Sequence, residues 1–291
     1  MAFEILNNSL VTPPRLHAMV RLTSRIKSPD REKLYDLLQP SFALQKLENQ
    51  DAAKGVFTAA RSCGLLAEDD QKVVALQVEP KAVERLGDFR RHMQRALLGI
   101  TDDSADNYLL NIYSAWYAVQ NDRVFQFAIK DFETRFNNEI FPDTEGRQFN
   151  TTKLNGWRDW AVFLGLGWNL RFGGRDLVVP DAHDRLEPLL DKLLPEGDRP
   201  VPFGAFMDLL AECCPELDGG VLFTRCWQAS RGTEPRGSQL SLMLSSGLRV
   251  LHEAGAIELS LVADAATKVQ LYPALGHPIA QVSQIRRGRA A

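Results

Sequence analysis

One residue pattern occurs three times along the chain, and it constrains the fold more than any other feature of the sequence. In each copy a helical stretch ends at a glycine, and an apolar run, a polar turn, a second apolar run and a proline follow. Glycine suits the left-handed conformation that often ends a helix, and two apolar runs around a polar turn are typical of a β-hairpin. The copies span Gly64 to Pro80, Gly165 to Pro180 and Gly255 to Pro273.

Helices are expected before each hairpin. In the first copy, apolar spacing and prolines predict helices over residues 15–26, 30–38 and 52–63, with Ser28 as the N-cap of the second helix. Helices followed by a hairpin are the order of a winged helix-turn-helix. We therefore predict a mainly α fold with small β-hairpins, in which tandem winged helix-turn-helix units are joined by a helical layer. The aromatic residues of that layer recur at helical spacing, which predicts a core.

The repeat divides the chain into three expected domains. Pro195 to Pro202 is the clearest linker between them. The expected domains are a winged-helix domain over residues 1–80, a helical layer with a second winged-helix-like unit over 81–194, and a C-terminal winged-helix domain with a basic tail over 195–291.

The last domain is expected to end in a hairpin and a tail. Residues 257–262 and 268–272 are the predicted strands of its wing. The tail contains Arg286, Arg287 and Arg289, which either hold phosphate loosely or belong to a disordered end.

The composition is that of a globular protein and not of a globally basic one. The 291 residues carry a formal net charge of −3, with 45% hydrophobic and 24% charged residues. A nucleic-acid partner must therefore be held by local positive patches. No apolar run approaches the roughly 20 residues of a membrane helix, and the N-terminus does not resemble a signal peptide. We expect a cytoplasmic protein without a membrane partner, whose four cysteines are small buried residues.

The sequence lacks the common motifs of catalysis. It contains no G-x-x-x-x-G-K-[ST] phosphate loop, no G-x-G-x-x-G, no G-x-S-x-G and no H-E-x-x-H. Its five histidines are scattered singly, and its cysteines do not have the spacing of zinc ligands. We therefore predict no catalytic residue, no metal and no cofactor, and an enzyme is the least expected class.

Candidate DNA contacts lie on the third helix of each unit and on the middle hairpin. A winged helix places its third helix in the major groove and basic groups of the wing on phosphates. The middle unit fits this use best because arginines flank its Gly-Gly tip, although an ordinary solvated hairpin has the same sequence features. The first wing is acidic at Glu68, Asp69 and Asp70 and would repel phosphate. The predicted contacts are Lys153, Asn155, Arg158, Arg171, Arg175, Lys54, Arg61 and Arg249.

The three glycine-to-proline segments and the chain length resemble the tandem winged-helix accessory proteins of bacterial DNA-modification and defence clusters. Among these, the sequence resembles the DpdG family, a component of the gene cluster that inserts 7-deazapurines into bacterial DNA. The resemblance implies work within a multi-protein system that acts on DNA, and it transfers no catalytic residue. A similar architecture occurs in tandem winged-helix subunits that bind SMC-type ATPases through a kleisin.

Three functions are compatible with these observations. The first is a non-enzymatic DNA-binding or adaptor subunit of a bacterial DNA-modification or phage-defence complex, which contacts duplex DNA through local basic patches and also contacts other subunits. The second is a protein-only scaffold whose winged helices make subunit contacts, which the acidic first wing favours. The third is a ligand-responsive transcriptional regulator. A homodimer is possible in each case.

Overall fold

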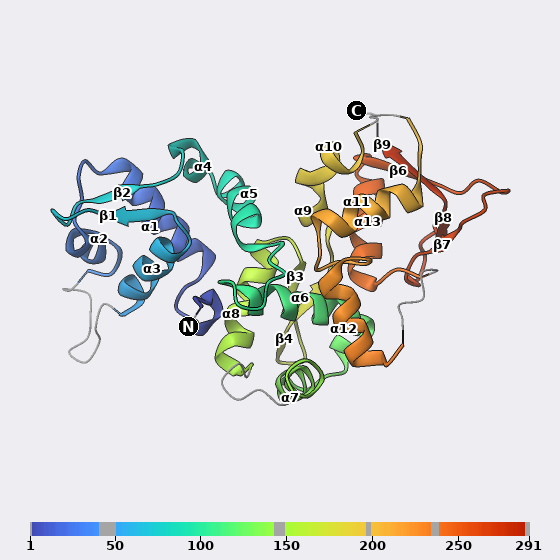
Figure 1. Ribbon diagram of the computed structural model, residues 1–291, viewed down its shortest axis with the longest axis horizontal. Coiled ribbons are helices and arrows are strands. Elements are labelled where there is room, and N and C mark those ends of the chain that lie inside the picture. The colour runs from blue at the N-terminus through green and yellow to red at the C-terminus, as the bar shows by residue number, and fades with distance from the viewer. Residues whose placement is uncertain (1, 41–50, 143–148, 196–198, 234–238, 289–291) are drawn as a thin grey trace.

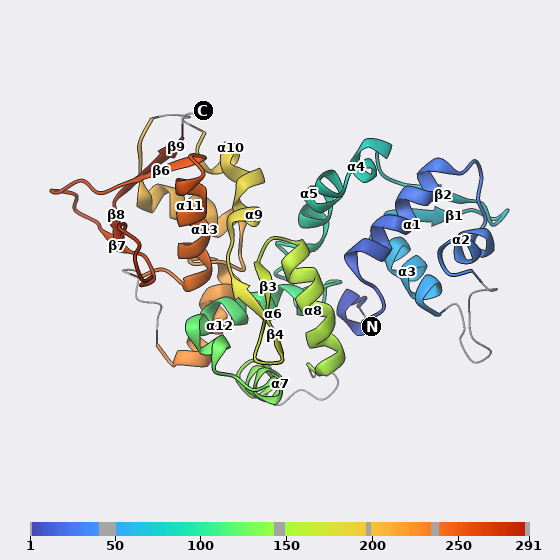
Figure 2. The same ribbon diagram turned by 180° about the vertical axis from the view of Figure 1, so that it is seen from behind.

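Helices form most of the molecule, and the strands form small antiparallel groups (Figure 1). The computed structural model describes residues 2–40, 51–142, 149–195, 199–233 and 239–288. An N-terminal lobe and a C-terminal lobe lie at opposite ends of the long axis, and the middle of the chain lies between them (Figures 1 and 2). The prediction of a mainly α fold with small β-hairpins is confirmed.

The N-terminal lobe contains the three predicted helices and the hairpin. Asp30 caps the second helix by accepting a hydrogen bond from the Lys33 N–H at 2.8 Å, so the prediction of Ser28 as the N-cap is wrong. Asp30 also forms an antiparallel bridge with Val73 beside the hairpin. The elements are η1 (Ile5–Asn7), α1 (Pro13–Arg25), α2 (Arg31–Leu38), α3 (Asp51–Ser62), β1 (Leu66–Glu68) and β2 (Val74–Leu76).

The middle segment is built around one buried helix. All residues of α6 (Tyr108–Gln120) except Leu109 are buried, and Tyr113 of this helix stacks on Phe149 with 3.7 Å between the ring centroids. The aromatic layer is therefore core, as predicted. The other elements are α4 (Pro80–Glu84), α5 (Leu86–Leu97), η3 (Asn121–Phe125), α7 (Ile129–Ile140), α8 (Thr151–Phe163), β3 (Gly167–Phe172) and β4 (Arg175–Pro180).

The C-terminal lobe begins with short helices and continues with three longer ones. Its helical elements are α9 (His183–Leu186), η4 (Glu187–Leu189), α10 (Leu190–Leu193), α11 (Phe203–Cys213), α12 (Val221–Arg231) and α13 (Leu242–Glu253). Its strands are β5 (Val201–Pro202), β6 (Ile257–Ser260), β7 (Val269–Gln270), β8 (Gln281–Val282) and β9 (Gln284–Arg287).

The predicted pairing of the third wing is wrong. β6 pairs with β9, whereas β7 pairs with β8, and β5 completes a three-stranded sheet in the order β5-β9-β6. The physical reason is that Val282 and Ile285 are both 0% exposed, so the end of the chain folds back and supplies buried apolar surface.

The prediction of a basic tail also differs from the structure, in which Arg286 and Arg287 form ion pairs within the lobe. Arg286 belongs to β9 and pairs with Glu258, and Arg287 lies 3.0 Å from the carboxylate of Asp191. Both arginines are therefore engaged within the lobe instead of forming a loose grip for phosphate. Arg289 lies outside the described residues.

The three repeated glycines end their helices in the same way. As predicted, all three adopt the left-handed conformation, with φ between +68° and +81°. In each copy the residue after the glycine donates its N–H to the carbonyl five positions back, which is the long bond of a Schellman C-cap. The glycines are Gly64, Gly165 and Gly255, and the bonds run from Leu65 to Ala60, Leu166 to Ala161 and Ala256 to Leu251. The sequence repeat is therefore a repeat of local structure.

Packed contacts cross both predicted domain boundaries. The Trp160 Nε1–H of α8 donates to the carbonyl of Val11 at 2.9 Å, which joins the N-terminal segment to the middle of the chain. Across the second boundary, α12 packs on α6, and Arg225 donates to the hydroxyl of Tyr108 at 2.7 Å. The successive segments therefore share buried surface.

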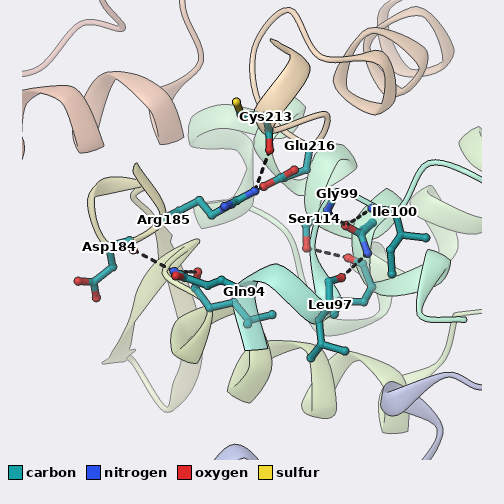
Figure 3. Close-up of polar contacts among 12 residues, drawn as sticks. Gln94, Leu97, Gly99, Ile100, Ser114, Asp184, Arg185, Cys213 and Glu216 are labelled. Atoms are coloured by element: carbon teal, nitrogen blue, oxygen red, sulfur yellow. Dashed lines mark hydrogen bonds and ion pairs between the residues drawn. The ribbon is translucent and has the colours of Figure 1, made fainter. Parts of the chain in front are cut away.

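A buried polar junction surrounds α9 (Figure 3). The Gln94 side-chain amide of α5 donates to the carbonyls of Leu164 at 3.0 Å and Asp184 at 2.9 Å. The next residue, Arg185, donates through Nε to Glu216 at 2.8 Å, and both side chains are almost fully buried. Adjacent residues of one short helix thus bind α5 on one side and the loop between α11 and α12 on the other.

Gly165→Ala is expected to destabilise the protein more than Gly64→Ala. Both positions have a positive φ, which costs an L residue roughly 1–2 kcal/mol. A Cβ at position 165 would also lie 2.6 Å from the backbone nitrogen of Arg185, whereas a Cβ at position 64 would meet nothing within 4 Å. Urea unfolding of the two variants measures the difference, and equal losses would contradict a close packing of α9 on this glycine.

Candidate nucleic-acid interface

The β3–β4 hairpin has one exposed strand and one largely buried strand. Gly173 and Gly174 at its tip have φ of +58° and +75°, and Phe172 faces Arg175 across them, so the predicted two-residue turn is present. The middle of β4 is buried, whereas most of β3 is exposed and forms a free edge of its two-stranded sheet. The hairpin lies beside α8 in both views (Figures 1 and 2).

Two large aromatic side chains of β3 are exposed. Trp168 is 45% and Phe172 is 69% exposed, and their spacing of four places them on the same face of the strand. Our sequence reasoning missed both, although the alternation of Trp168, Leu170 and Phe172 already placed them together. An exposed aromatic pair can stack on nucleic-acid bases or become buried against a protein.

The two hairpin arginines lie on opposite faces near the tip. The Arg171 side chain is 82% exposed, and its Nε lies 3.7 Å from the carboxylate of its cross-strand neighbour Asp176. An ion pair so exposed contributes little, so the guanidinium can exchange this carboxylate for a phosphate. Arg175 is half-buried and donates to the carbonyls of Phe127 and Phe125 at 3.3 and 3.4 Å. Arg171 is therefore the more accessible of the two.

On α8, the predicted contacts differ in accessibility. Asn155 is exposed and accepts a hydrogen bond from Arg158 at 3.4 Å, so these two side chains form one polar patch. Lys153 is half-buried, where desolvation lowers its pKa, and the nearby Glu4 carboxylate opposes that shift. Because Lys153 lies beside this internal carboxylate, it is less available to DNA than the other two.

The first-unit candidates lie on α3 in the N-terminal lobe, away from the central hairpin (Figure 1). Lys54 and Arg61 are exposed. The carboxylate of Glu68 lies 3.9 Å from Arg61 and 3.8 Å from Arg31. Arg31 and Arg61 therefore offset the negative charge of Glu68, which is one of the acidic wing residues that we expected to repel phosphate.

The structure does not bring Arg249 together with the other candidates. Its side chain is 5% exposed, and Nη2 donates to the carbonyl of Ile279 at 3.2 Å. This guanidinium lies under the segment that joins β7 to β8, so the groove of a DNA duplex does not reach it.

Among the described residues, no cluster of three or more His, Cys, Asp or Glu side chains could hold a metal ion. Cys214 and Cys226 are buried as predicted, whereas Cys63 and Cys213 are half-buried. Burial raises the pKa of Cys63 to about 12, which disfavours a thiolate nucleophile. Within the same described part of the chain, none of the helices has the length and apolar content to cross a membrane.

Glu4→Gln is expected to flatten the pH dependence of stability. Burial raises the pKa of Glu4 to about 7, although hydrogen bonds from the Leu6 and Leu110 N–H groups oppose the shift. The folded protein therefore retains a proton that the unfolded chain loses near pH 4.5. The free energy of unfolding should fall between these two values as the pH rises, by up to about 1.4 kcal/mol per pH unit.

Urea unfolding at about pH 5 and about pH 7 measures this slope. Glu187→Gln removes a carboxylate from an exposed position and serves as the control. An unchanged slope in Glu4→Gln, or an equal reduction in the control, would contradict the assignment of the proton to Glu4.

Comparison with known proteins gives one family match. The chain matches the family model described as DpdG-like over residues 3–265. The match includes α3, α8, α13 and the β3–β4 hairpin, and it stops before β7. No curated protein and no solved structure matches the chain. The chain therefore belongs to the DpdG-like family, which links it to a DNA-modification system.

Proposed function

We propose that this chain is a DNA-binding subunit, without catalytic chemistry of its own, of a multi-protein bacterial DNA-modification or phage-defence system. One observation carries the proposal. The β3–β4 hairpin, which packs against α8, exposes Arg171 on one face of β3 and Trp168 and Phe172 on the other. Membership of the DpdG-like family supplies the context of DNA modification.

The order of the elements supports the assignment of three winged helix-turn-helix units. The units are α1–α2–α3 with β1–β2, α6–α7–α8 with β3–β4, and α11–α12–α13 with β6 and β9. In the first unit, the bridge between Asp30 and Val73 adds a short strand between the first two helices, where a winged helix has its first strand. The third helix of each unit ends in the same Schellman C-cap.

The middle unit is best suited to contact DNA. The third helix of a helix-turn-helix module enters the major groove, where an amide or a guanidinium such as those of Asn155 and Arg158 hydrogen-bonds to base edges. Arg171 would then neutralise a phosphate. Asp159 and Asp176 stand near these groups and confine the positive potential to a small area. We therefore expect binding by the isolated chain to be weak and dependent on salt.

Replacing Arg171 and Arg175 together by Ala is expected to weaken binding to all duplex sequences. Each lost phosphate contact should reduce the slope of log affinity against log salt by about 0.9. Fluorescence anisotropy with labelled duplex and single-stranded DNA at several salt concentrations measures the slope. The half-buried position of Arg175 predicts that Arg171→Ala alone accounts for most of the change.

The matched control is the double variant Arg21→Ala with Arg85→Ala, which removes two exposed arginines far from the hairpin in sequence. This control should keep the slope of the unmodified protein. If the two double variants bind alike, the hairpin does not contact DNA.

A protein-only scaffold is the second candidate, and the free edge of β3 favours it. The edge offers unpaired backbone groups, and Trp168 and Phe172 flank them with exposed apolar surface. A strand of another subunit, or of a second copy of this chain, could pair with such an edge.

Phe172→Ser is expected to separate the two candidates. If β3 binds a protein strand, this variant should lose co-purification with the other proteins of the system, or its dimer in analytical ultracentrifugation, while the salt slope for DNA stays unchanged. If the aromatic side chain stacks on bases, single-stranded DNA binding should weaken by about 1–3 kcal/mol with intact protein contacts. Leu275→Ser, at another exposed apolar position, is the control.

A further inference from the structure

The C-terminal lobe contains a cavity that the proposed DNA interface does not use. Its volume is about 640 Å³, which is the size of a pocket for a small organic molecule. Its walls come from α13, from the end of β6 and from the β7–β8 hairpin with the segment that joins its strands. The segment between β6 and β9, whose strand pairing differs from the prediction, therefore forms one side of the cavity.

A buried arginine lines this cavity. Arg249 is 5% exposed, and among the described residues its Nε has no hydrogen-bond partner. Its Nη2 donates to the carbonyl of Ile279, which is neutral. A buried guanidinium is costly unless a negative group pairs with it, and it offers five donors in a planar fork.

No internal carboxylate of the described residues is seen to pair closely with this guanidinium. Glu253 lies one helical turn further along α13, and its charge opposes the lowering of the pKa of Arg249 that burial causes. The Glu253 carboxylate, however, pairs with His277 at 3.1 Å. The positive charge of Arg249 is therefore only partly compensated.

Three glutamine amides line the cavity together with Ser260 and His277. Gln270 and Gln281 are direct partners across β7 and β8, so their side chains lie on the same face of the hairpin. Their neighbours Val269 and Val282 are buried on the opposite face, which turns both amides away from the core. Gln239 is bridged to Gln270 and also lines the cavity.

We propose that this cavity binds a small phosphate monoester of nucleotide size, with its phosphate on Arg249 and its hydrogen-bonding body on the glutamine amides. A phosphate accepts two parallel hydrogen bonds from a guanidinium, and this pairing suits a buried arginine better than a neutral acceptor does. Amides donate and accept, so they match the mixed edge of a heterocyclic base. The proposal does not depend on DNA binding by the β3–β4 hairpin.

Two sources can supply this chemistry, namely a free nucleotide and the terminal phosphate of a DNA strand. Isothermal titration calorimetry with the four deoxynucleoside monophosphates tests the first, and the matching deoxynucleosides show the contribution of the phosphate. A 5′-phosphorylated oligonucleotide compared with its 5′-hydroxyl form tests the second. Binding that requires the phosphate in either arm supports the proposal and identifies the source.

Arg249→Met keeps the length of the side chain and removes its charge. We expect it to reduce the affinity for the phosphate monoester by at least about tenfold, with a matching loss of the ligand-induced rise in melting temperature. Arg287→Met removes an arginine of the same lobe that pairs with Asp191 outside the cavity, and it should bind as the unmodified protein does. The Arg171→Ala, Arg175→Ala variant should also retain this binding.

If Arg249→Met fails to fold, Gln281→Leu tests the same cavity from β8 and should lower the affinity several-fold. The proposal is overturned if the unmodified protein binds no phosphate monoester at millimolar concentration. It is also overturned if nucleosides bind as tightly as nucleotides, or if a folded Arg249→Met or Gln281→Leu variant binds without loss.

Discussion

The close approach of α9 to two glycines determines how the middle unit and the C-terminal lobe are held together. A Cβ at Gly165, after α8, would lie 2.6 Å from the backbone of Arg185, and a Cβ at Gly247, within α13, would lie 2.7 Å from that of His183. The backbone of α9 therefore touches both units at positions where no other residue fits. Arg90 of α5 adds an ion pair with Asp184 at 2.6 Å. The middle hairpin departs directly from this contact, so its position relative to the C-terminal lobe is set there.

The buried ion pair of Arg185 with Glu216 also holds α9 in place. Both side chains are almost fully buried, and the cost of removing two charges from water roughly cancels their attraction. The pair therefore adds little net stability, but either charge left alone would be strongly unfavourable. Any packing that separates α9 from the loop between α11 and α12 is penalised, and this fixes α9 within the C-terminal lobe.

Local signals in the sequence were sufficient for the first three helices, apart from the N-cap of the second, and for the first two hairpins. Glycines at helix ends and the Gly-Gly turn each act within a few residues, so a single sequence reveals them. The third wing depends on β6 meeting β9 across more than twenty residues that carry no periodic pattern. The same error hid the environment of Arg249, because the segment that covers it was assigned to a tail.

The candidate site could be predicted only where exposure follows from local pattern. Arg171 stands on a strand edge beside a turn and is accessible for that reason, whereas Lys153 meets Glu4, which is 149 positions away in the chain. Charge alone would also give the hairpin only a weak attraction for DNA. Asp176 lies beside Arg171 and offsets part of its positive charge, and salt screens the remaining field within about 10 Å. Stacking on Trp168 and Phe172 does not depend on salt in this way. Because Arg171 lies on the opposite face of β3 from these aromatic side chains, a nucleic acid would have to pass around the tip of the hairpin to use both contacts, and a flexible strand with partly unstacked bases is better suited to this than a stiff duplex.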